Sequence, residues 1–138
     1  MTSYVLDTSV AIAWYLPEVF TEAARSWQSK LVDGEINFHV PTLHYWEMAN
    51  VLRSHVRRGQ ISRKLATDIW EVHLDAELQT ADPVTDEVLA VAFDYDATAY
   101  DAVYIALAIQ LDLRLVTAER PSTDWVRKLG KRALSITV

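Results

Sequence analysis

The sequence predicts a single, three-layer α/β domain in which helices cover both faces of a parallel sheet. Short segments rich in β-branched and aromatic residues alternate with longer amphipathic segments, which is typical of strand-helix-strand crossovers. The chain of 138 residues is long enough to bury one substantial core. It contains no cysteine, which excludes disulfides and thiolate zinc sites. The whole chain, residues 1–138, is therefore interpreted as one domain.

The N-terminal third predicts two strands and two helices. The first strand, Tyr4–Leu6, leads directly into Asp7, and the hydroxyls that follow it favour a helix through Leu16. Pro17 ends this helix because proline cannot continue the hydrogen-bonding pattern. The next elements are a helix over residues 18–32 and a strand over residues 38–40.

Two amphipathic segments then predict a helical hairpin. Thr42 is placed to cap a helix that ends at Arg57 and Arg58, and Ser62 is placed to cap a second helix that ends at Leu74. Residues 59–61 connect them. We expect this hairpin to protrude from the sheet as an arm.

The second half of the chain continues the alternation. Leu78–Val84 gives the weakest signal and is compatible with a short strand ended by Pro83. Thr85 begins a helix that includes Phe93, and Thr98 begins the most hydrophobic helix, which we expect to be buried. The remaining ranges are 99–111 for that helix, 114–117 for a strand, 121–129 for a short helix and 134–138 for a last strand.

Four acidic residues lie near the predicted carboxyl ends of strands, where parallel sheets bind ligands. Asp7 ends the first strand, and Glu47 lies one turn into the helix after the second, with Asn50 on the same helical face. Asp101 lies in the first turn of the hydrophobic helix, and Glu119 follows the strand over residues 114–117. These four side chains are the candidate catalytic and metal-binding residues.

Each acid also has a purely structural explanation. The Asp7 carboxylate can accept hydrogen bonds from free N–H groups at a helix start, and Asp101 forms a capping-box pattern with Thr98. Glu47 can lie on a solvated helix face, and Glu119 can be an ordinary loop residue.

Their joint placement favours a metal site, because crowded carboxylates raise one another's pKa values unless cations neutralise them. Carboxylate oxygens suit Mg²⁺ or Mn²⁺, and four such groups would balance up to two divalent ions. A pair of ions can activate water and stabilise the leaving oxygen of a phosphodiester.

Basic residues are concentrated although the net charge is −6. Five of them lie on the predicted arm, where they suggest contacts to phosphate groups: Arg53, Arg57, Arg58, Arg63 and Lys64. Solvated helix ends remain an alternative for any one of them. The longest apolar run, residues 102–109, is too short for a membrane span, and the N-terminus has no basic signal-peptide region. We therefore expect a soluble cytoplasmic protein without membrane contact.

The histidines and tryptophans give no separate site. The histidines, at positions 39, 44, 55 and 73, lack the spacing of a zinc protease and are interpreted as core or surface residues. Most tryptophans occupy apolar helical positions, which favours packing in the core or between subunits.

Several stretches occur in a characteristic order over nearly the whole chain. They cover residues 6–10 with 14–18, 40–43 with 46–52, 98–108, and 115–120. Together they resemble the PIN-domain family, and most closely the VapC-type toxin ribonucleases of bacterial and archaeal toxin-antitoxin pairs. The resemblance implies a five-stranded parallel sheet of order 3-2-1-4-5 and an endoribonuclease that uses Mg²⁺ or Mn²⁺. It also implies a homodimer, a cognate VapB-type antitoxin in the acidic cleft, and a structured RNA substrate such as tRNA or ribosomal RNA.

The resemblance also implies roles for individual residues. The first three acids of the family fall on Asp7, Glu47 and Asp101, and Asp7 and Asp101 are the most dependable metal ligands. The fourth is usually aspartate, whereas this chain has Glu119, so that either metal affinity is altered or Asp124 contributes. Three hydroxyl residues match positions that hold water or an acid in place: Thr8, Ser9 and Thr117.

Two other functions remain open at this stage. The first is a catalytically silent PIN-fold binding protein, for which Glu119 would mark the lost activity. The second is a metal-dependent hydrolase of small phosphate esters that forms a phosphoenzyme at Asp7. This second function is disfavoured because Ser9 stands where a second acid would be needed, and no lysine partner is evident.

Overall fold

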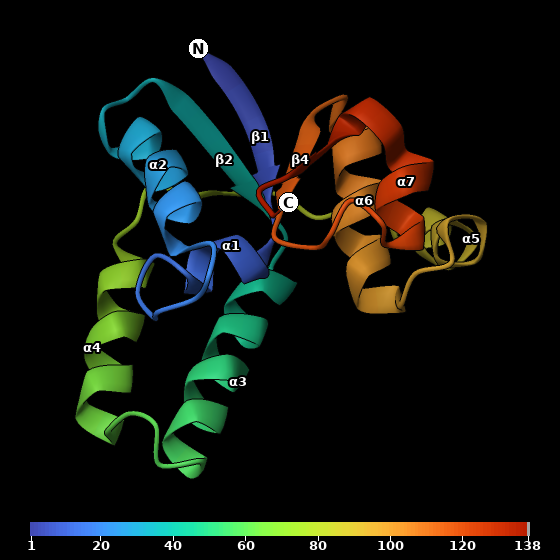
Figure 1. Ribbon diagram of the computed structural model, residues 1–138. Helices are drawn as coiled ribbons and strands as arrows, with labels where there is room; N and C mark the ends of the chain where they lie inside the picture. The colour runs from blue at the N-terminus through green and yellow to red at the C-terminus, as the bar shows by residue number, and fades with distance from the viewer. Residues whose placement is uncertain (138) are drawn as a thin grey trace.

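The computed structural model describes residues 1–137 and contains the predicted five-stranded parallel sheet, in the order β3-β2-β1-β4-β5 (Figure 1). Its strands are β1 (Thr2–Leu6), β2 (Ile36–Val40), β3 (Gln79–Thr80), β4 (Arg114–Thr117) and β5 (Ala133–Ser135). In the central strand, Tyr4 pairs with Phe38 of β2 on one side and with Arg114 of β4 on the other. The carboxyl ends of β1 and β4 therefore lie side by side.

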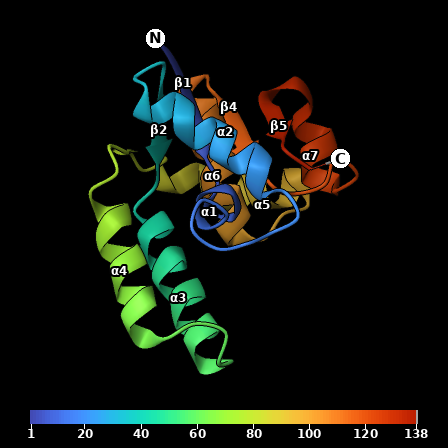
Figure 2. The ribbon, with the colours of Figure 1, turned by 60° about the vertical axis from the view of Figure 1, so that its left-hand side comes forward.

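Helices cover both faces of this sheet, as predicted (Figures 1 and 2). They are α1 (Thr8–Ile12), α2 (Thr21–Val32), α3 (Leu43–Arg57), α4 (Arg63–Leu74), α5 (Thr85–Tyr95), α6 (Ala99–Leu111) and α7 (Asp124–Leu129), followed by a 3₁₀ turn, η1 (Gly130–Arg132). Because successive side chains of a strand point to opposite faces, Leu6 packs in the core with α1 to α4, and Val5 packs with α6 and α7.

The helices α3 and α4 form the predicted hairpin, which extends away from the sheet in both views (Figures 1 and 2). Gly59 occupies the turn with a φ of +72°, a conformation that favours glycine. The Ser62 hydroxyl caps α4 by accepting a hydrogen bond from the backbone N–H of Leu65 at 3.0 Å. The predicted cap at Thr42 is wrong, because its hydroxyl donates to Asp82 at 2.7 Å and its side chain does not cap α3.

Two helices in the first half of the chain are shorter than predicted. The helix α1 ends at Ile12 rather than at Leu16, because tight turns hold the four residues before Pro17. The helix α2 begins at Thr21 rather than at residue 18, because the Thr21 hydroxyl accepts a hydrogen bond from the Glu18 N–H at 2.7 Å. The hydroxyl thus holds the chain in a turn outside the helix.

The C-terminal elements differ from prediction in the same way. The helix α7 begins at Asp124 rather than at residue 121, after a turn in which the Thr123 N–H bonds to the carbonyl of Arg120. The strand β5 covers Ala133–Ser135 rather than residues 134–138. At the end of this strand and just beyond it, the hydroxyls of Ser135 and Thr137 donate to the Glu119 carbonyl. Val138, also part of the predicted strand, lies outside the described residues.

The most hydrophobic helix, α6, is buried as predicted. Its residues 104–108 are at most 2% exposed, and the Thr98 hydroxyl caps its first turn by accepting from the Asp101 N–H at 3.1 Å. Within residues 1–137, no helix combines the length and the hydrophobicity that crossing a membrane requires.

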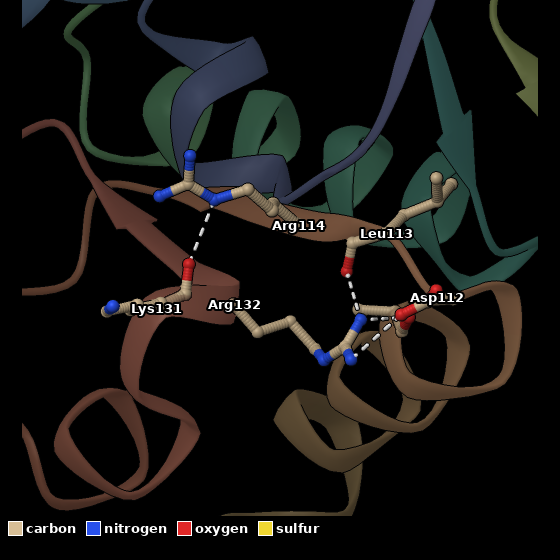
Figure 3. A network of polar contacts seen from close by, with 6 residues as sticks. Asp112, Leu113, Arg114, Lys131 and Arg132 are labelled. Carbon is tan, nitrogen blue, oxygen red and sulfur yellow. Dashed lines mark hydrogen bonds and ion pairs between the residues drawn. The ribbon is translucent and has the colours of Figure 1, made fainter.

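A set of polar contacts fixes the end of α6 against the last crossover (Figure 3). Asp112 ends the helix in a left-handed conformation, with a φ of +54°. The Arg132 guanidinium donates to the carbonyl of Leu113 at 3.1 Å and to the Asp112 carboxylate at 3.0 Å. Nearby, Arg114 Nε donates to the carbonyl of Lys131 at 2.9 Å. Arg132 also donates to the carbonyl of Ala108, one of the last carbonyls of α6, at 3.4 Å.

Candidate functional site

The carboxylate of Asp7 lies at the carboxyl end of the central strand and is only 9% exposed. Its backbone N–H bonds to the Val116 carbonyl at 3.0 Å, which continues the pairing of β1 with β4. One carboxylate oxygen, Oδ2, accepts from Thr117 at 2.8 Å and from Ser9 at 3.0 Å. Among the described residues, no hydrogen bond reaches Oδ1. The side chain is therefore held through one oxygen, and the other remains open to a ligand.

The same two hydroxyls organise the loop that carries Glu119. Ser9 Oγ accepts from the backbone N–H of Ala118 at 3.1 Å, and Thr117 Oγ1 accepts from that of Glu119 at 3.1 Å. The Glu119 side chain is exposed and has only a long contact, 3.4 Å, from the Thr123 hydroxyl. The two hydroxyls thus fix both the Asp7 carboxylate and the Glu119 backbone, whereas the Glu119 carboxylate has no short hydrogen bond to a described residue.

Glu47 is held by donors from two other elements. Its Oε1 atom accepts from the Tyr104 hydroxyl at 2.5 Å and from the Thr8 hydroxyl at 3.1 Å. Tyr104 lies three residues after Asp101 on α6, so both project from adjacent turns of one helical face. The helix α6 therefore supplies one acid of the site and the donor that orients another.

The four acids interact electrostatically with one another. Burial raises the pKa of Asp7 to about 6; the charges of Asp101 and Glu47 add to this effect, and the hydrogen bonds from Thr117 and Ser9 oppose it. Burial also raises the pKa of Asp101, and the charges of Glu119 and Glu47 raise it further. The charges of neighbouring acids thus act on Asp7 and Asp101, which brings carboxylates from four separate segments of the chain to one place.

The chemistry of this cluster fits a hard divalent cation. Among residues 1–137, no group of three or more histidine, aspartate or glutamate side chains is arranged so that it could hold a metal ion, so the protein does not supply a complete cage. A cage is not required for Mg²⁺, which keeps several water ligands and is usually bound by one or two carboxylates together with substrate phosphates. The open Oδ1 of Asp7, beside the carboxylate of Asp101, matches that mode of binding.

Two predicted supporting residues make no hydrogen bond to the four acids among the described residues. Asn50 is exposed on α3, and its side chain makes no hydrogen bond to any described residue. The Asp124 carboxylate pairs with Arg127 of the same helix and is not among the charges that raise the pKa of Asp7 or Asp101. Of the two sequence-based alternatives at the fourth position, the structure therefore brings Glu119 and not Asp124 to Asp101.

The basic residues of the hairpin lie at a different place from the acids. Arg53, Arg57 and Arg63 line a groove of about 390 Å³ between α3 and α4, whose floor is apolar and includes Leu52 and Trp70. Of the other two predicted residues, Arg58 is exposed beside the turn, and Lys64 pairs with Asp68 at 3.0 Å. The groove is thus a positively charged surface separate from the carboxylates.

The sequence interpretation missed a group of buried polar side chains behind the acids. His44 and His73 are fully buried and contact each other through their Nε2 atoms at 2.7 Å, and His44 also contacts Thr8. The spacing of Tyr104 to Asp101 was a usable signal, because it places a hydroxyl on the same helical face as the acid. The pairing of the histidines had no such signal, since it joins α3 to α4.

Comparison with known proteins gives one consistent result. The model of the PIN domain family matches residues 4–120. Over 120 residues, the chain is 31% identical to Ribonuclease VapC3 of Pyrobaculum aerophilum. The matched region covers 84% of this chain and 88% of that protein.

Solved structures show the same fold. The crystal structure of PAE2754 from Pyrobaculum aerophilum matches with a TM-score of 0.75 and 25% identity over 98% of this chain and 84% of that one. A toxin-antitoxin complex from Klebsiella pneumoniae matches with a TM-score of 0.64 and 14% identity, over 98% and 99% of the two chains. FitAcB from Neisseria gonorrhoeae matches with a TM-score of 0.58 and 15% identity, over 96% and 97%.

Proposed function

Because the chain belongs to the PIN-domain family, with a VapC ribonuclease among its relatives, we propose that it is a metal-dependent endoribonuclease and the toxin of a VapBC-type pair. The observation that carries this proposal is the cluster of mutually repelling carboxylates at the carboxyl end of the sheet. Burial and neighbouring charges disfavour the ionised forms of Asp7 and Asp101, and a bound cation would favour them. Hydrolysis of an RNA phosphodiester would use the bound cation to activate water and to stabilise charge at the phosphate.

The residues proposed to hold Mg²⁺ or Mn²⁺ are Asp7 and Asp101, with Glu47 and Glu119 completing the set for up to two ions. When bound, the metal supplies a water of lowered pKa and charge stabilisation at the phosphate. Asp7 is prepared for this role because Thr117 and Ser9 bind its other carboxylate oxygen. Glu47 is oriented by the Tyr104 hydroxyl.

The proposed substrate is a structured RNA of the tRNA or ribosomal RNA class. The groove lined by Arg53, Arg57 and Arg63 supports this part of the proposal, because guanidinium groups bind phosphates in a bidentate manner. Arg58 and Lys64 add charge beside it. The overall charge of −6 would repel RNA elsewhere, so we expect binding to be confined to this surface.

The proposed protein partners are a second copy of the chain and a VapB-type antitoxin. A homodimer is supported by apolar side chains that α5 leaves in solvent, with Leu89 64% exposed and Phe93 76% exposed. An antitoxin segment that covers the acid cluster should carry arginine or lysine, because a cation there offsets the repulsion between carboxylates.

The function is tested by expressing the protein briefly in cells and sequencing the 5′ ends of RNA fragments. We expect new ends at a few sites in structured RNA with the parent chain and none with Asp7→Asn. Asp33→Asn, an exposed position at the end of α2, is the matched control and should cut as the parent does. Identical fragments from Asp7→Asn would refute the site assignment, and a folded parent that cuts no RNA would favour a silent binding protein.

A further inference from the structure

A continuous chain of hydrogen bonds runs behind the acid cluster. It begins at Tyr15, whose hydroxyl contacts His73 Nδ1 at 2.7 Å, and passes through the contact between His73 Nε2 and His44 Nε2. His44 Nδ1 then contacts the Thr8 hydroxyl at 2.8 Å. Thr8 contacts the Tyr104 hydroxyl at 2.7 Å, and both hydroxyls reach Glu47. The chain thus connects α4 of the hairpin to a carboxylate of the proposed site.

The direction of these hydrogen bonds follows from the carboxylate end. The Tyr104 hydroxyl donates its one hydrogen to a carboxylate oxygen of Glu47. In the contact between Thr8 and Tyr104, Thr8 must then be the donor. The single Thr8 hydrogen points towards Tyr104 and Glu47, and Thr8 has only lone pairs left for His44.

The histidines must then take one pair of tautomers. His44 Nδ1 carries a hydrogen and donates it to Thr8. Burial lowers the pKa of His44 to about 3 and that of His73 to about 4, so both rings are neutral at pH 7 and each carries one hydrogen. His44 Nε2 is therefore an acceptor, His73 Nε2 its donor, and His73 Nδ1 accepts from the Tyr15 hydroxyl.

We propose that His44 and His73 are positioning residues that fix the hydrogen of Thr8 towards Tyr104 and Glu47, and so hold Glu47 ready for a metal ion. If His73 could not donate, His44 would be free to move its hydrogen to Nε2. His44 Nδ1 would then become an acceptor and would compete for the hydrogen of Thr8. The donors at Glu47 would be weakened although neither histidine touches it.

The direction of the network stands on the hydrogen-bond geometry and on the neutrality of the two buried imidazole rings, whereas its effect on metal binding rests on the proposed function. Direction is measured directly by ¹⁵N NMR of the imidazole rings in the metal-free parent chain. We expect the hydrogen of His44 on Nδ1 and that of His73 on Nε2. The opposite tautomers in the folded protein would overturn the inference without any variant being made.

The effect on the metal is measured with two substitutions of His73. His73→Phe removes the donor to His44, whereas His73→Gln keeps an amide N–H near the position of Nε2. Partners that orient metal ligands indirectly change metal affinity by about 10- to 100-fold, and His73 acts two residues further away, through His44 and Thr8. We therefore expect about 3- to 10-fold weaker Mn²⁺ binding for His73→Phe, measured by calorimetry without RNA, and near-parent binding for His73→Gln.

A purely structural role would give a different result. The phenyl ring fills the buried space better than the glutamine side chain, so loss of packing would harm His73→Gln at least as much as His73→Phe. Equal Mn²⁺ affinity in the parent and both folded variants would overturn the positioning role. A folded parent that binds no Mn²⁺ would refute the proposed function instead, and the tautomers would still decide the direction of the network.

Discussion

Replacing Asp7 by asparagine is expected to stabilise the metal-free protein at pH 7. The pKa of Asp7 is about 6 in the folded chain and 3.8 as a free side chain, chiefly because the carboxylate is buried. This difference corresponds to a penalty of about 3 kcal/mol in the free energy of unfolding once the group is ionised. The asparagine amide is neutral, so the variant does not carry this penalty.

Part of that gain is offset by the amide group itself. The amide oxygen can take the position of Oδ2, to which Thr117 and Ser9 donate. The NH₂ group then takes the position of Oδ1, where no described residue accepts a hydrogen bond, at a cost of about 1 kcal/mol. The net expectation is that Asp7→Asn is more stable than the parent by about 1–2 kcal/mol at pH 7.

The pH dependence gives the sign of the effect. Between about pH 4 and pH 6, the folded parent binds a proton that the unfolded chain has lost, so its stability falls as the pH rises through this window. The advantage of Asp7→Asn should therefore be absent near pH 4 and complete above pH 6. Urea unfolding at pH 4, 5, 6 and 7 measures this, with Asp33→Asn as the exposed control that should stay within about 0.5 kcal/mol of the parent. A less stable Asp7→Asn at pH 7, or a stability difference that does not vary with pH, would refute the electrostatic reasoning.

Three further predictions concern the hairpin and the helix ends. The first replaces the three groove arginines, Arg53, Arg57 and Arg63, by glutamine. This should weaken RNA binding and reduce the slope of log affinity against log salt by about 0.7–0.9 for each phosphate that is no longer neutralised. An unchanged slope would mean that these arginines do not bind phosphate. Asp96→Gly should stabilise the chain by about 0.5–1 kcal/mol in thermal unfolding, because Asp96 ends α5 with a φ of +52°; a lower melting temperature would contradict this. Thr98→Ala should cost about 1 kcal/mol by removing the cap of α6, and Thr98→Ser should restore it, so equal melting temperatures for the two variants would exclude a capping role.

The sequence predicted the alternation of strands and helices well because hydrophobic periodicity is a local property. The hairpin of α3 and α4 and the buried helix α6 follow directly from such patterns. The order of the strands came from family resemblance, since periodicity does not identify neighbours in a sheet. Errors fell at helix ends, where hydroxyls have several available partners: Thr42 donates to Asp82, and Thr21 holds Glu18 outside α2.

Asp7, Glu47 and Glu119 could be proposed from sequence because each follows a strand, and the ends of parallel strands meet at one edge. Asp101 instead lies in the first turn of α6, which follows another helix. The network behind these acids could not be proposed from sequence, because hydrogen bonds between buried side chains depend on how helices distant in sequence pack together. The contact of His44 with His73 spans 29 residues, and that of Thr8 with Tyr104 spans 96. The solvent exposure of individual side chains was equally hard to predict from the sequence. Trp46, for example, lies beside Glu47 on α3 but is 67% exposed.

On the proposed function, the carboxylate cluster should cut RNA only when it holds a divalent cation. The most direct test of this expectation is cleavage of structured RNA by purified, folded protein, first with EDTA and then with Mg²⁺ or Mn²⁺, for the parent and for Asp101→Asn. We predict cleavage by the parent with metal, none with EDTA, and none by Asp101→Asn under either condition. Cleavage in EDTA would show that the reaction does not need a divalent cation, and cleavage by folded Asp101→Asn at the parent rate would show that it does not occur at this cluster.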